Sequence, residues 1–318
     1  MQPPYTISNK ILQLVASISE KIGEVNASHL NKPSAELRKT NRIKTIQSSL
    51  EIEGNSLSFE QITAILGEKR ILGPKKDILE VQNAIEVYNK LSEFKSLSLQ
   101  SLLHAHKLLM KGLIEVPGKL RNRGVGIVKG SKISHFAPGG EMVMPLLNDL
   151  LKYLKMSKDI VLIKSCVFHY EFEFIHPFLD GNGRMGRLWQ TLILMEKYPV
   201  FEYLPLESII KKRQRSYYAT LGISDKSGNS TVFIEFMLQI ILDSLEELLS
   251  SQNFSLHSVD RIEIFKLVIG NNIFTRKDYL RKYKEVSPAT ASRDLREGVA
   301  KGLLEKKGDK RNAIYRYL

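Results

Sequence analysis

The sequence predicts a mainly α-helical protein that carries one small β-hairpin and a separate, basic C-terminal unit. Through most of the 318 residues, apolar side chains recur three and four positions apart, which is the spacing of a helix with one buried face. The stretch 124–135 instead alternates apolar and polar residues on both sides of Lys129-Gly130-Ser131, which indicates two short strands and a turn. Residues 257–318 hold 15 basic and 8 acidic side chains, so about half of the net charge of +13 lies there.

The composition is that of an ordinary globular protein. Hydrophobic residues make up 43% of the chain, and its length suggests about two domains. No apolar run is long enough to cross a bilayer, and the N-terminus lacks the features of a signal peptide, so we expect a cytoplasmic protein with no membrane partner. The single cysteine, Cys166, lies in an apolar run and is expected to be a small buried residue rather than a nucleophile. The positive net charge favours anionic partners.

The N-terminal region, 1–95, is expected to contain several helices. A second helix runs from about 34 to 50 and ends near Gly54-Asn55, residue types that accept a left-handed backbone. Ser58 and Gln61 have the spacing of a capping box, which opens a short third helix. The apolar residues that mark one face of the first helix are Ile7, Ile11, Leu14, Val15 and Ile18. Two more helices are expected further along the chain, at 79–91 and 99–113.

The central region, 96–222, continues after the hairpin with helices at 144–154 and 160–174. The second of these is apolar nearly all round, so it is expected to lie at the centre of the fold. Pro177 cannot continue it and pushes the preceding residue out of the helical conformation, which leaves His176 at the exit of a buried helix. The remaining predictions are helices at 183–196, 209–221 and 232–249, a helical connector over 223–256, and a linker at 250–253.

The segment from His176 to Arg187, HPFLDGNGRMGR, predicts a site for phosphate. Gly181 and Gly183 allow the backbone to curl with its N–H groups pointing inward, at the positive end of the helix that begins near Gly183. Arg184 and Arg187 are three residues apart and share a face of that helix, where planar guanidinium groups can clamp phosphate oxygens.

Three more side chains of this segment add to the prediction. Asp180, beside a polyphosphate, can hold Mg²⁺, which proteins bind through one or two carboxylates together with phosphate oxygens. An imidazole such as that of His176 titrates near neutrality and is suited to take a proton from an attacking hydroxyl. Phe178 is expected to bury itself and draw the loop inward. The grouping of these side chains within twelve residues favours a catalytic site over chance.

The segment resembles the signature of the Fic family, HPFx(D/E)GNGRxxR, and matches it at every defined position. The resemblance implies a mostly helical fold and transfer of AMP from Mg-ATP to a Ser, Thr or Tyr hydroxyl of a protein. It also implies that His176 is the general base and that Asp180 is the Mg²⁺ ligand. It further implies that Asn182 and the loop amides of Gly181 and Gly183 hold the phosphates of ATP. Arg184 and Arg187 would bind the outer phosphates.

Two further stretches extend the resemblance, which covers about 35–222. The hairpin at 124–135 is similar to the flap of the family, which would align a protein substrate by strand pairing, and PGKLR at 117–121 is similar to the lead into that flap. The sequence SLEIEG at 49–54 is similar to the inhibitory (S/T)xxxE(G/N) helix, so the resemblance implies that Glu53 inhibits the enzyme by pairing with Arg187. Because Gly183 is intact, the loop differs from kinase-like relatives that carry lysine there.

The other histidines of the helical region give weaker signals. His104 and His106 are two apart on a helix and face different ways, so they make a poor metal pair. His169 lies inside the expected central helix, where a histidine with satisfied hydrogen bonds in the core is the better interpretation.

Residues 257–318 are similar to a winged helix-turn-helix. A helix, a short helix and a third helix opened by Ser287-Pro288 precede a turn at 306–311 and a strand near 314–317. In such a unit the third helix would meet a DNA groove through Thr290, Ser292, Arg293 and Arg296. The wing would contact the phosphates through Lys306, Lys307, Lys310 and Arg311. Winged helices also serve as protein docking modules, so both kinds of partner stay open.

The sequence therefore predicts a protein adenylyltransferase that uses ATP and Mg²⁺ and that Glu53 holds inactive. Two alternatives stay open. One is a hydrolase that removes AMP, with Glu53 activating water; the other is a DNA-binding regulator whose Fic core senses nucleotide. The presence of His176 and Arg187 weighs against the regulator, because sensing alone needs no base. The expected partners are a protein substrate at 124–135 and, left open, DNA at 257–318 and a second copy of the chain.

Overall fold

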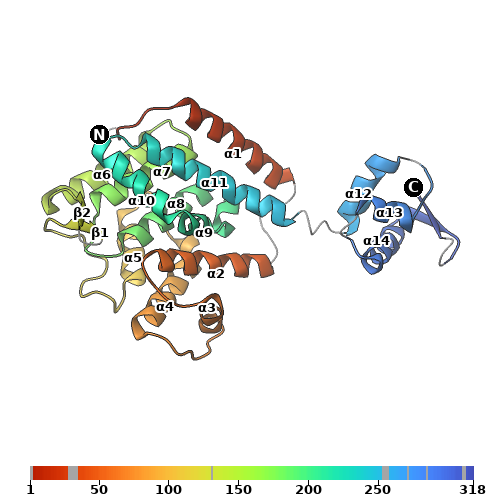
Figure 1. The fold of residues 1–318 in the computed structure, drawn as a ribbon, viewed down its shortest axis with the longest axis horizontal. Helices are drawn as coiled ribbons and strands as arrows, with labels where there is room; N and C mark the ends of the chain where they lie inside the picture. The colour runs from red at the N-terminus through yellow and green to blue at the C-terminus, as the bar shows by residue number, and fades with distance from the viewer. Residues whose placement is uncertain are drawn as a thin grey trace. The chain divides into compact units, whose positions relative to one another are not determined.

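The computed structural model divides the chain into two compact units, Met1–Glu246 and Glu247–Leu318 (Figure 1). It describes residues 3–318 except 28–34, 130–131, 253–257, 271, 284–285 and 310–312. The described part is mainly helical, as predicted. None of its helices is both long enough and apolar enough to cross a membrane. The two units are described separately below.

Unit 1 begins with five helices that follow the predicted order. Ser58 and Gln61 form the predicted capping box at the start of the third helix. The fourth helix begins four residues earlier than predicted, directly after Pro74, and the fifth ends at Leu109 rather than 113. These helices are α1 (Asn9–Ala27), α2 (Ala35–Ile52), α3 (Phe59–Leu66), α4 (Lys75–Asn89) and α5 (Leu99–Leu109), with a 3₁₀ turn at Leu91–Glu93.

The predicted hairpin is present as two antiparallel strands, β1 (Gly126–Lys129) and β2 (Lys132–Phe136). Ile127 lies opposite His135 and Val128 opposite Ile133, so the register shifts by one residue between the two pairs. Such a bulge strengthens the local twist of a strand pair. The Gly130-Ser131 part of the predicted turn lies outside the described residues.

The second half of unit 1 is a helical layer built around α7. The buried helix α7 packs most extensively on α8, and both contribute large apolar side chains such as Phe168 and Trp189 to the core. This confirms the central position predicted for 160–174. The elements of this half are α6 (Gly140–Met156), α7 (Val161–Ile175), α8 (Asn182–Lys197), a 3₁₀ turn (Pro199–Tyr203), α9 (Leu206–Lys212), α10 (Gln214–Ser227) and α11 (Thr231–Gln252).

Two predicted boundaries in this half are wrong. The single helix expected at 209–221 is two helices, because the backbone leaves the helical conformation at Arg213, with φ −111° and ψ 28°. The break falls in the polar run 211–214, where there is no apolar residue whose periodicity could reveal it. The linker expected at 250–253 is also wrong, since α11 continues through Gln252.

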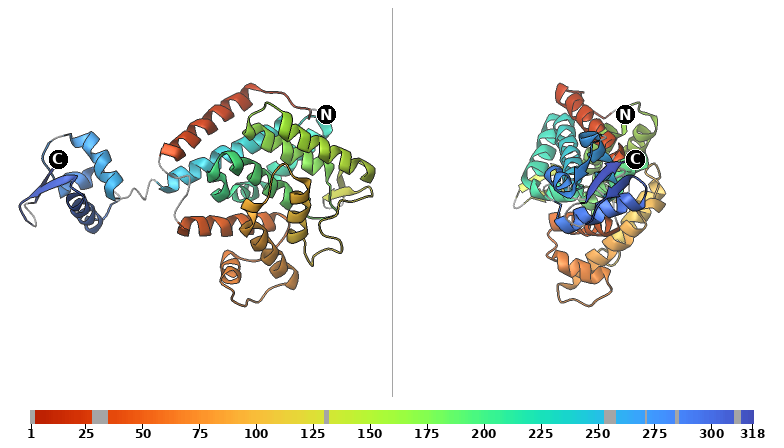
Figure 2. Two further views of the ribbon diagram at one scale, coloured as in Figure 1. Left: turned by 180° about the vertical axis from the view of Figure 1, so that it is seen from behind. Right: turned by 90° about the vertical axis from the view of Figure 1, so that its right-hand side faces the viewer.

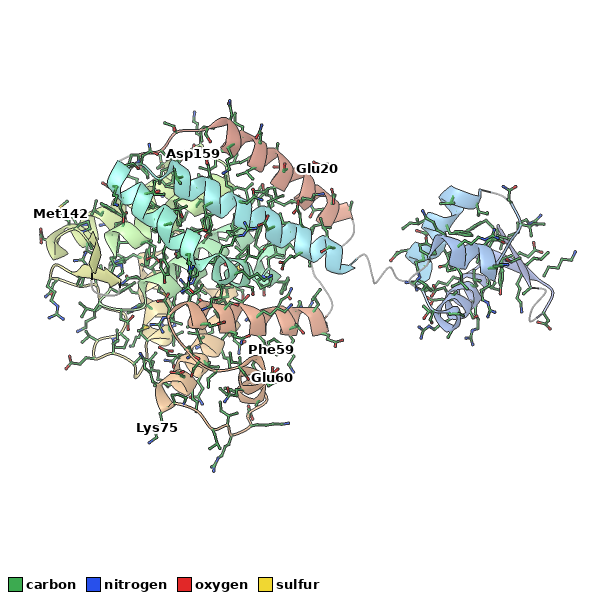
Figure 3. All side chains as sticks on the ribbon, viewed as in Figure 1. Glu20, Phe59, Glu60, Lys75, Met142 and Asp159 are labelled. Carbon is green, nitrogen blue, oxygen red and sulfur yellow. The ribbon has the colours of Figure 1, made fainter. Side chains whose placement is uncertain are left out.

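The N-terminal segment runs along the outside of unit 1, and α1 lies beside α11 (Figures 1 and 2). Ser8 Oγ donates to Glu235 Oε1 of α11 at 2.6 Å, and the Thr6 N–H donates to Thr231 Oγ1 at 2.9 Å. At the start of the segment, the Tyr5 hydroxyl donates to the Asp159 carboxylate, which is labelled in Figure 3. The first residues are thereby tied to both α11 and the end of α6.

The described residues of unit 2 form three helices and a small antiparallel sheet in the strand order β3-β5-β4. The helix order of this unit agrees with the prediction, and β5 lies where a strand was expected. The short strand β3 was not predicted, and β4 includes Lys306 and Lys307, which were expected in the turn. A bidentate ion pair between Arg261 and the buried Asp294, with both N–O distances 2.7 Å, joins its first and third helices. The elements are α12 (Ser258–Ile269), β3 (Phe274–Thr275), α13 (Arg276–Lys282), α14 (Pro288–Ala300), β4 (Leu304–Lys307) and β5 (Ile314–Tyr317).

Candidate active site

His176 occupies the C-cap of the buried helix α7, at the exit that the sequence predicted. Its backbone is left-handed, with φ 49° and ψ 60°, and its N–H still donates to the Phe172 carbonyl at 2.9 Å. Among the described non-glycine residues, only Glu68 shares a positive φ. A left-handed histidine carries backbone strain that the surrounding contacts must hold, and such strain is concentrated at functional sites.

Arg121 supplies much of that support. Its buried guanidinium donates to the His176 carbonyl at 2.7 Å and to the Ile175 carbonyl at 2.9 Å. The same group donates to the carbonyls of Arg123 at 2.6 Å and Pro138 at 2.7 Å, which lie on either side of the hairpin. Arg121 therefore ties the end of α7 to both ends of the flap. The sequence indicated the PGKLR stretch but not this role.

The loop after His176 closes on itself through Asn182. The Asn182 amide nitrogen donates to the Phe178 carbonyl, and the Phe178 N–H donates to the Asn182 amide oxygen, both at 2.9 Å. Phe178 is completely buried, as predicted. The paired hydrogen bonds brace the turn, and α8 begins at Asn182, so its N-terminus faces the same side as the loop.

Asp180 is the carboxylate of the loop, and 56% of its side chain is accessible. Its Oδ1 atom accepts from the Gly181 N–H at 2.6 Å and lies 3.3 Å from Arg184 Nη2. No group of three or more His, Cys, Asp or Glu side chains in the described part of the chain could hold a metal ion. A single accessible carboxylate beside a phosphate site fits Mg²⁺, which takes its other ligands from phosphate oxygens and water.

Arg184 is buried and held by a carboxylate that the sequence gave no reason to select. Its Nη1 atom lies 3.2 Å from Glu80 Oε1, and Glu80, in α4, is itself buried. The other oxygen of Glu80 accepts from the Asn55 amide at 2.8 Å. Asn55 directly follows the predicted inhibitory turn, so Glu80 connects that turn to Arg184.

Arg187 and Glu53 form the ion pair that the resemblance implied. Arg187 Nη2 donates to Glu53 Oε1 at 2.8 Å, to the Ser49 carbonyl at 3.0 Å, and Nε donates to Ser49 Oγ at 3.2 Å. Burial acts to lower the pKa of Arg187, but the Glu53 carboxylate raises it above the usual value. The pair fills the space above Gly183, where an added Cβ would lie 2.6 Å from Glu53 Oε1.

The last turn of α2 is held by side chains from three helices of the catalytic region. Besides Arg187 on α8, Lys211 on α9 donates to the Glu51 carbonyl at 3.1 Å, and Gln214 on α10 donates to the Ile52 carbonyl at 3.0 Å. Carbonyls in the last turn of a helix have no partner within it, so these contacts satisfy groups that would otherwise need water. Glu53 therefore directly follows a helix end whose carbonyls are bound by side chains of other helices.

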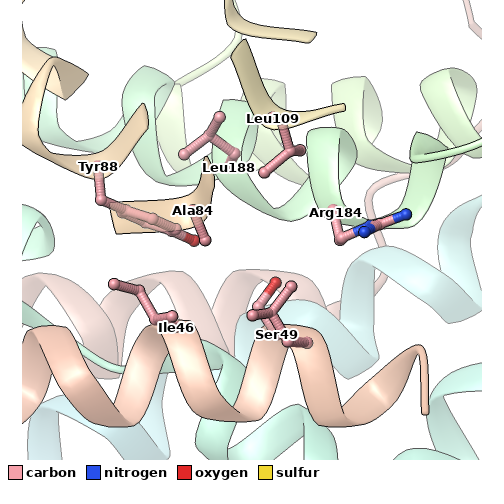
Figure 4. Close-up of a pocket in the computed structure, with 8 residues that line it drawn as sticks. Ile46, Ser49, Ala84, Tyr88, Leu109, Arg184 and Leu188 are labelled. Carbon is pink, nitrogen blue, oxygen red and sulfur yellow. The ribbon is translucent and has the colours of Figure 1, made fainter. Parts of the chain in front are cut away.

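A small pocket lies where α2 faces α4, α5 and α8, close to Arg184 (Figure 4). Ile46 and Ser49 of α2 point into it from one side, and Leu188 of α8 from the other. Its lining is mostly apolar, which shows that α2 is packed on the region that carries the arginines. The N-terminal region is therefore part of the same compact unit as the loop.

His106 lies directly beneath the loop, although the sequence gave it no role. Its ring stacks on Phe178 with 3.6 Å between centroids and 5° between planes. His169 behaves as predicted, since it is fully buried and lies 2.6 Å from Gln190 Oε1 and 2.9 Å from the Tyr217 hydroxyl. His104, by contrast, is exposed, and its ring lies edge-on to that of Phe94.

Comparison with solved structures identifies the family of this arrangement. The crystal structure of a Fic family protein from Desulfovibrio desulfuricans G20 matches with a TM-score of 0.77 and 39% sequence identity, covering 100% of this chain and 98% of that one. The chain belongs to the Fic family. The sequence model of the Fic/DOC family matches residues 96–194, from just before α5 to α8. A structure of Fic-1 from C. elegans, 20% identical, shares the fold with a TM-score of 0.62 over 77% of this chain and 75% of that one.

Curated relatives of this Fic protein include two named as adenylyltransferases. One is the probable protein adenylyltransferase aq_aa38 of Aquifex aeolicus, 39% identical over 97 residues that make up 30% of this chain and 29% of that protein. The other is the protein adenylyltransferase fic-1 of Caenorhabditis elegans, 25% identical over 60% of this chain and 38% of that protein. The chain thus spans well under half of the length of these two relatives. The Fic match stops at 194, so the predicted boundary at 222 stays a prediction.

Proposed function

We propose that this Fic protein transfers AMP from Mg-ATP to a Ser, Thr or Tyr hydroxyl of a protein and that Glu53 holds it inactive. The observation that carries the proposal is the meeting of His176, the Asp180 loop, Arg184 and Arg187 at the junction of α7 and α8, with Glu53 paired to Arg187 at 2.8 Å. The adenylyltransferase names of the relatives support the same reaction.

The proposed chemistry assigns one task to each group. His176 takes the proton of the attacking hydroxyl, whose oxygen forms a bond to the α-phosphorus while the bond to the departing pyrophosphate breaks. The N–H groups of the loop and the positive end of α8 stabilise the negative charge that develops there. Asp180 would hold Mg²⁺, which neutralises phosphate charge when bound. Arg184 and Arg187 would bind the outer phosphates and so orient the leaving group.

We assign the contact with the protein substrate to the hairpin of β1 and β2. A two-stranded hairpin has unpaired edge groups that an extended peptide segment can pair with, and such pairing gives affinity without fixing the peptide sequence. Arg121 ties both ends of this hairpin to the carbonyl of His176. A segment paired to the hairpin would therefore be held in a defined position relative to the base.

Inhibition follows from competition for one guanidinium. While Arg187 is paired with Glu53 and Ser49, it is not available to an outer phosphate. Attack on the α-phosphorus requires the pyrophosphate to leave in line with the incoming hydroxyl, so a small displacement of the phosphates lowers the rate strongly. Activation then requires that the end of α2 moves or that Glu53 is removed.

The test is labelled AMP incorporation by wild type, Glu53→Gly, Arg187→Ala and the double variant at equal ATP. Glu53→Gly should raise incorporation, first visible as self-modification, and Arg187→Ala should abolish it with or without Glu53. No gain from a Glu53→Gly protein that is folded and binds ATP would remove the inhibitory role of Glu53. Release of AMP from the modified protein by wild type, lost in Glu53→Gly, would instead support the hydrolase alternative.

For unit 2 we propose binding to DNA through α14. The two acidic residues of this helix are both paired, Asp294 with Arg261 and Glu297 with Lys301 at 2.9 Å, while Arg293 and Arg296 are exposed. The exposed face therefore carries more positive than negative charge. Thr290 and Ser292 are partly exposed on the same helix. Of the proposed phosphate contacts, Lys306 is paired with Asp309 at 3.1 Å, and Lys310 and Arg311 lie outside the described residues.

This second proposal predicts salt-dependent affinity for duplex DNA, because phosphate contacts release counterions. The full chain and its Arg293→Ala/Arg296→Ala variant would be titrated with labelled duplex at several salt concentrations. Arg316→Ala, which removes a residue paired with Glu305, is the matched control. An affinity for DNA that does not change with salt, with the Arg293→Ala/Arg296→Ala substitution or with deletion of 257–318 would favour a role of unit 2 in protein docking.

A further inference from the structure

His106 makes two hydrogen bonds that fix which ring nitrogen carries its proton. The Gly118 N–H donates to His106 Nδ1 at 2.8 Å, so Nδ1 is an acceptor without a proton. In the neutral ring the proton is then on Nε2, which lies 3.0 Å from the Asp180 carbonyl oxygen and donates to it. The ring is fully buried. These two backbone contacts therefore fix a single tautomer of the neutral ring.

The ring also forms the floor of the catalytic loop. It stacks on Phe178, and Gly181 lies so close that an added Cβ would be 2.7 Å from Met110 Sδ and 3.4 Å from His106 Nε2. Three residues of the loop, Phe178, Asp180 and Gly181, thus lie against His106 of α5 and Met110, which caps that helix. The contact to Asp180 is to its carbonyl, which belongs to the same peptide group as the Gly181 N–H.

On its other side, His106 reaches the lead into the flap. Gly118 has φ +81°, and a Cβ added there would lie 2.9 Å from the Leu103 carbonyl of α5. Only glycine therefore fits at this point, where the PGKLR stretch lies close against α5. Three residues later, Arg121 holds the His176 carbonyl and both ends of the hairpin. His106 consequently lies between the two parts of the chain that must meet in the reaction, the phosphate loop and the segment that orients the flap.

We propose that His106 is a positioning residue that sets the orientation of the Asp180–Gly181 peptide through its Nε2–H donor. The inference rests on the proposed transfer of AMP, and it adds a residue for which neither the sequence nor the comparisons assign a role. His106 does not act as a base, since both ring nitrogens are engaged by backbone groups. A change in this peptide would turn the Gly181 N–H and move the Asp180 carboxylate that accepts from it at 2.6 Å.

A packing role alone predicts a different response to substitution. The ring could be replaced by any side chain that fills the space under Phe178, with a stability cost but no selective effect on the loop. The buried hydrogen bond to Asp180 predicts that a donor at the Nε2 position matters more than the ring itself, because an unsatisfied buried carbonyl is costly and the loop would move to satisfy it. Substitutions that separate the two hydrogen bonds can distinguish these roles.

Two amide substitutions make that separation. In His106→Gln the amide nitrogen is able to occupy the Nε2 position and donate to Asp180, whereas in His106→Asn the amide oxygen matches Nδ1 and accepts from Gly118 but the side chain is too short to reach Asp180. Both would be made in the Glu53→Gly protein. We expect His106→Gln to keep kcat within about threefold and His106→Asn to lose roughly tenfold or more, because small displacements of reacting groups have large effects on rate.

His104→Gln and His104→Asn, on the same helix but exposed, are the matched controls. His106→Phe keeps a ring against Phe178 and loses both hydrogen bonds, so its kcat should fall as in His106→Asn. If the Asn variant does not fold, the Phe variant still distinguishes positioning from packing. Folding is checked through the single tryptophan, Trp189, which is buried in α8. Equal losses of kcat in His106→Gln and His106→Phe would overturn the positioning role. An unchanged kcat in His106→Phe or in His106→Asn would overturn it as well.

A second measurement separates this proposal from the proposed function. Binding of a nonhydrolysable Mg-ATP analogue would be measured by calorimetry for the same variants, with the Mg²⁺ concentration varied. If no transfer is detected in the parent protein, the adenylyltransferase proposal fails, while weaker Mg²⁺-dependent binding in Asn and Phe than in Gln still supports the role of His106 in the loop. A parent that binds no nucleotide would overturn both.

Discussion

Arg187 donates a 3.0 Å hydrogen bond to the backbone carbonyl of Ser49, in addition to its ion pair with Glu53. The backbone contact does not depend on any side chain of α2. Removing the Glu53 carboxylate therefore leaves the arginine attached to α2, although more weakly.

This relationship predicts that Glu53→Gly activates only in part. Replacing Ser49 by Ala as well removes the Oγ acceptor that lies 3.2 Å from Arg187 Nε, so the guanidinium should turn toward an outer phosphate more readily. A hydrogen bond to a charged group contributes about 1.5–3 kcal/mol, so we expect ATP affinity in the Ser49→Ala/Glu53→Gly protein about tenfold or more above that of Glu53→Gly. Calorimetric titration with Mg-ATP measures it. Ser48→Ala, next in the chain, is the control; equal affinities in the two main variants would contradict the prediction.

Gln214→Ala should activate the protein without touching the proposed catalytic groups. Its amide caps the Ile52 carbonyl at the end of α2, and the loss of one such hydrogen bond weakens the helix end by about 1 kcal/mol. Fraying of that turn frees Glu53 to leave Arg187, so AMP incorporation should rise about fivefold or less. Gln13→Ala, exposed on α1, should have no effect. A Gln214→Ala protein as inactive as wild type would show that the cap does not hold the inhibitory turn.

His176→Ala should keep nucleotide binding and lose transfer, because only the proton-abstraction step is removed. In the Glu53→Gly protein, kcat should fall by about 10²-fold or more while the affinity for Mg-ATP stays within about twofold. Radiolabel incorporation and calorimetry give the two quantities. Transfer at the parent rate would overturn the assignment of His176 as the base.

Arg121→Lys should impair the use of a protein substrate more than the binding of ATP. Lysine keeps the charge but cannot reach four carbonyls at once, so the hairpin should lose its fixed position relative to His176. We expect a higher KM for the protein substrate and a lower kcat, with an unchanged dissociation constant for Mg-ATP. Lys119→Arg, two residues earlier and exposed, is the control. A parallel loss of ATP affinity would indicate that Arg121 supports the loop rather than the flap.

The stability of unit 1 should fall as the pH is lowered below 6.5, partly through His169. Burial lowers the pKa of His169 to about 3, so the unfolded chain binds a proton near pH 6.5 that the folded chain does not. The stabilisation is complete above pH 6.5 and decreases as the pH falls toward 3, with about 2 kcal/mol lost by pH 5. Urea unfolding followed by Trp189 should show a smaller loss between pH 7 and 5 in His169→Gln than in wild type or His104→Gln. Equal losses in all three would contradict the shift.

The sequence predicted most of the helices and the loop because their signals are local. The continuous apolar run of α7, the proline after His176 and the glycines of the loop each act over a few residues. The break at Arg213 escaped because the polar residues around it carry no periodicity. Local patterns predict an element well only where the chain around it has a strong apolar rhythm.

The partners of the site residues could not be predicted from local patterns. Glu80 is 104 residues from Arg184, and His106 is 74 residues from Asp180, so only the folded chain brings them together. A buried glutamate and a buried histidine look, in sequence, like ordinary members of amphipathic helices. Glu53 was the exception, because its motif resembled one whose partner in the loop was known.

The space above Gly183 also constrains how such a protein can change in evolution. A side chain at this position would meet the Glu53 carboxylate at 2.6 Å and the Arg187 guanidinium at 3.1 Å, so the ends of these two side chains must shift if the loop gains one. Positions 53, 183 and 187 are thereby coupled in evolution: a residue gained at 183 disturbs the ion pair between Glu53 and Arg187, so a change at any one of the three alters what the other two can accept.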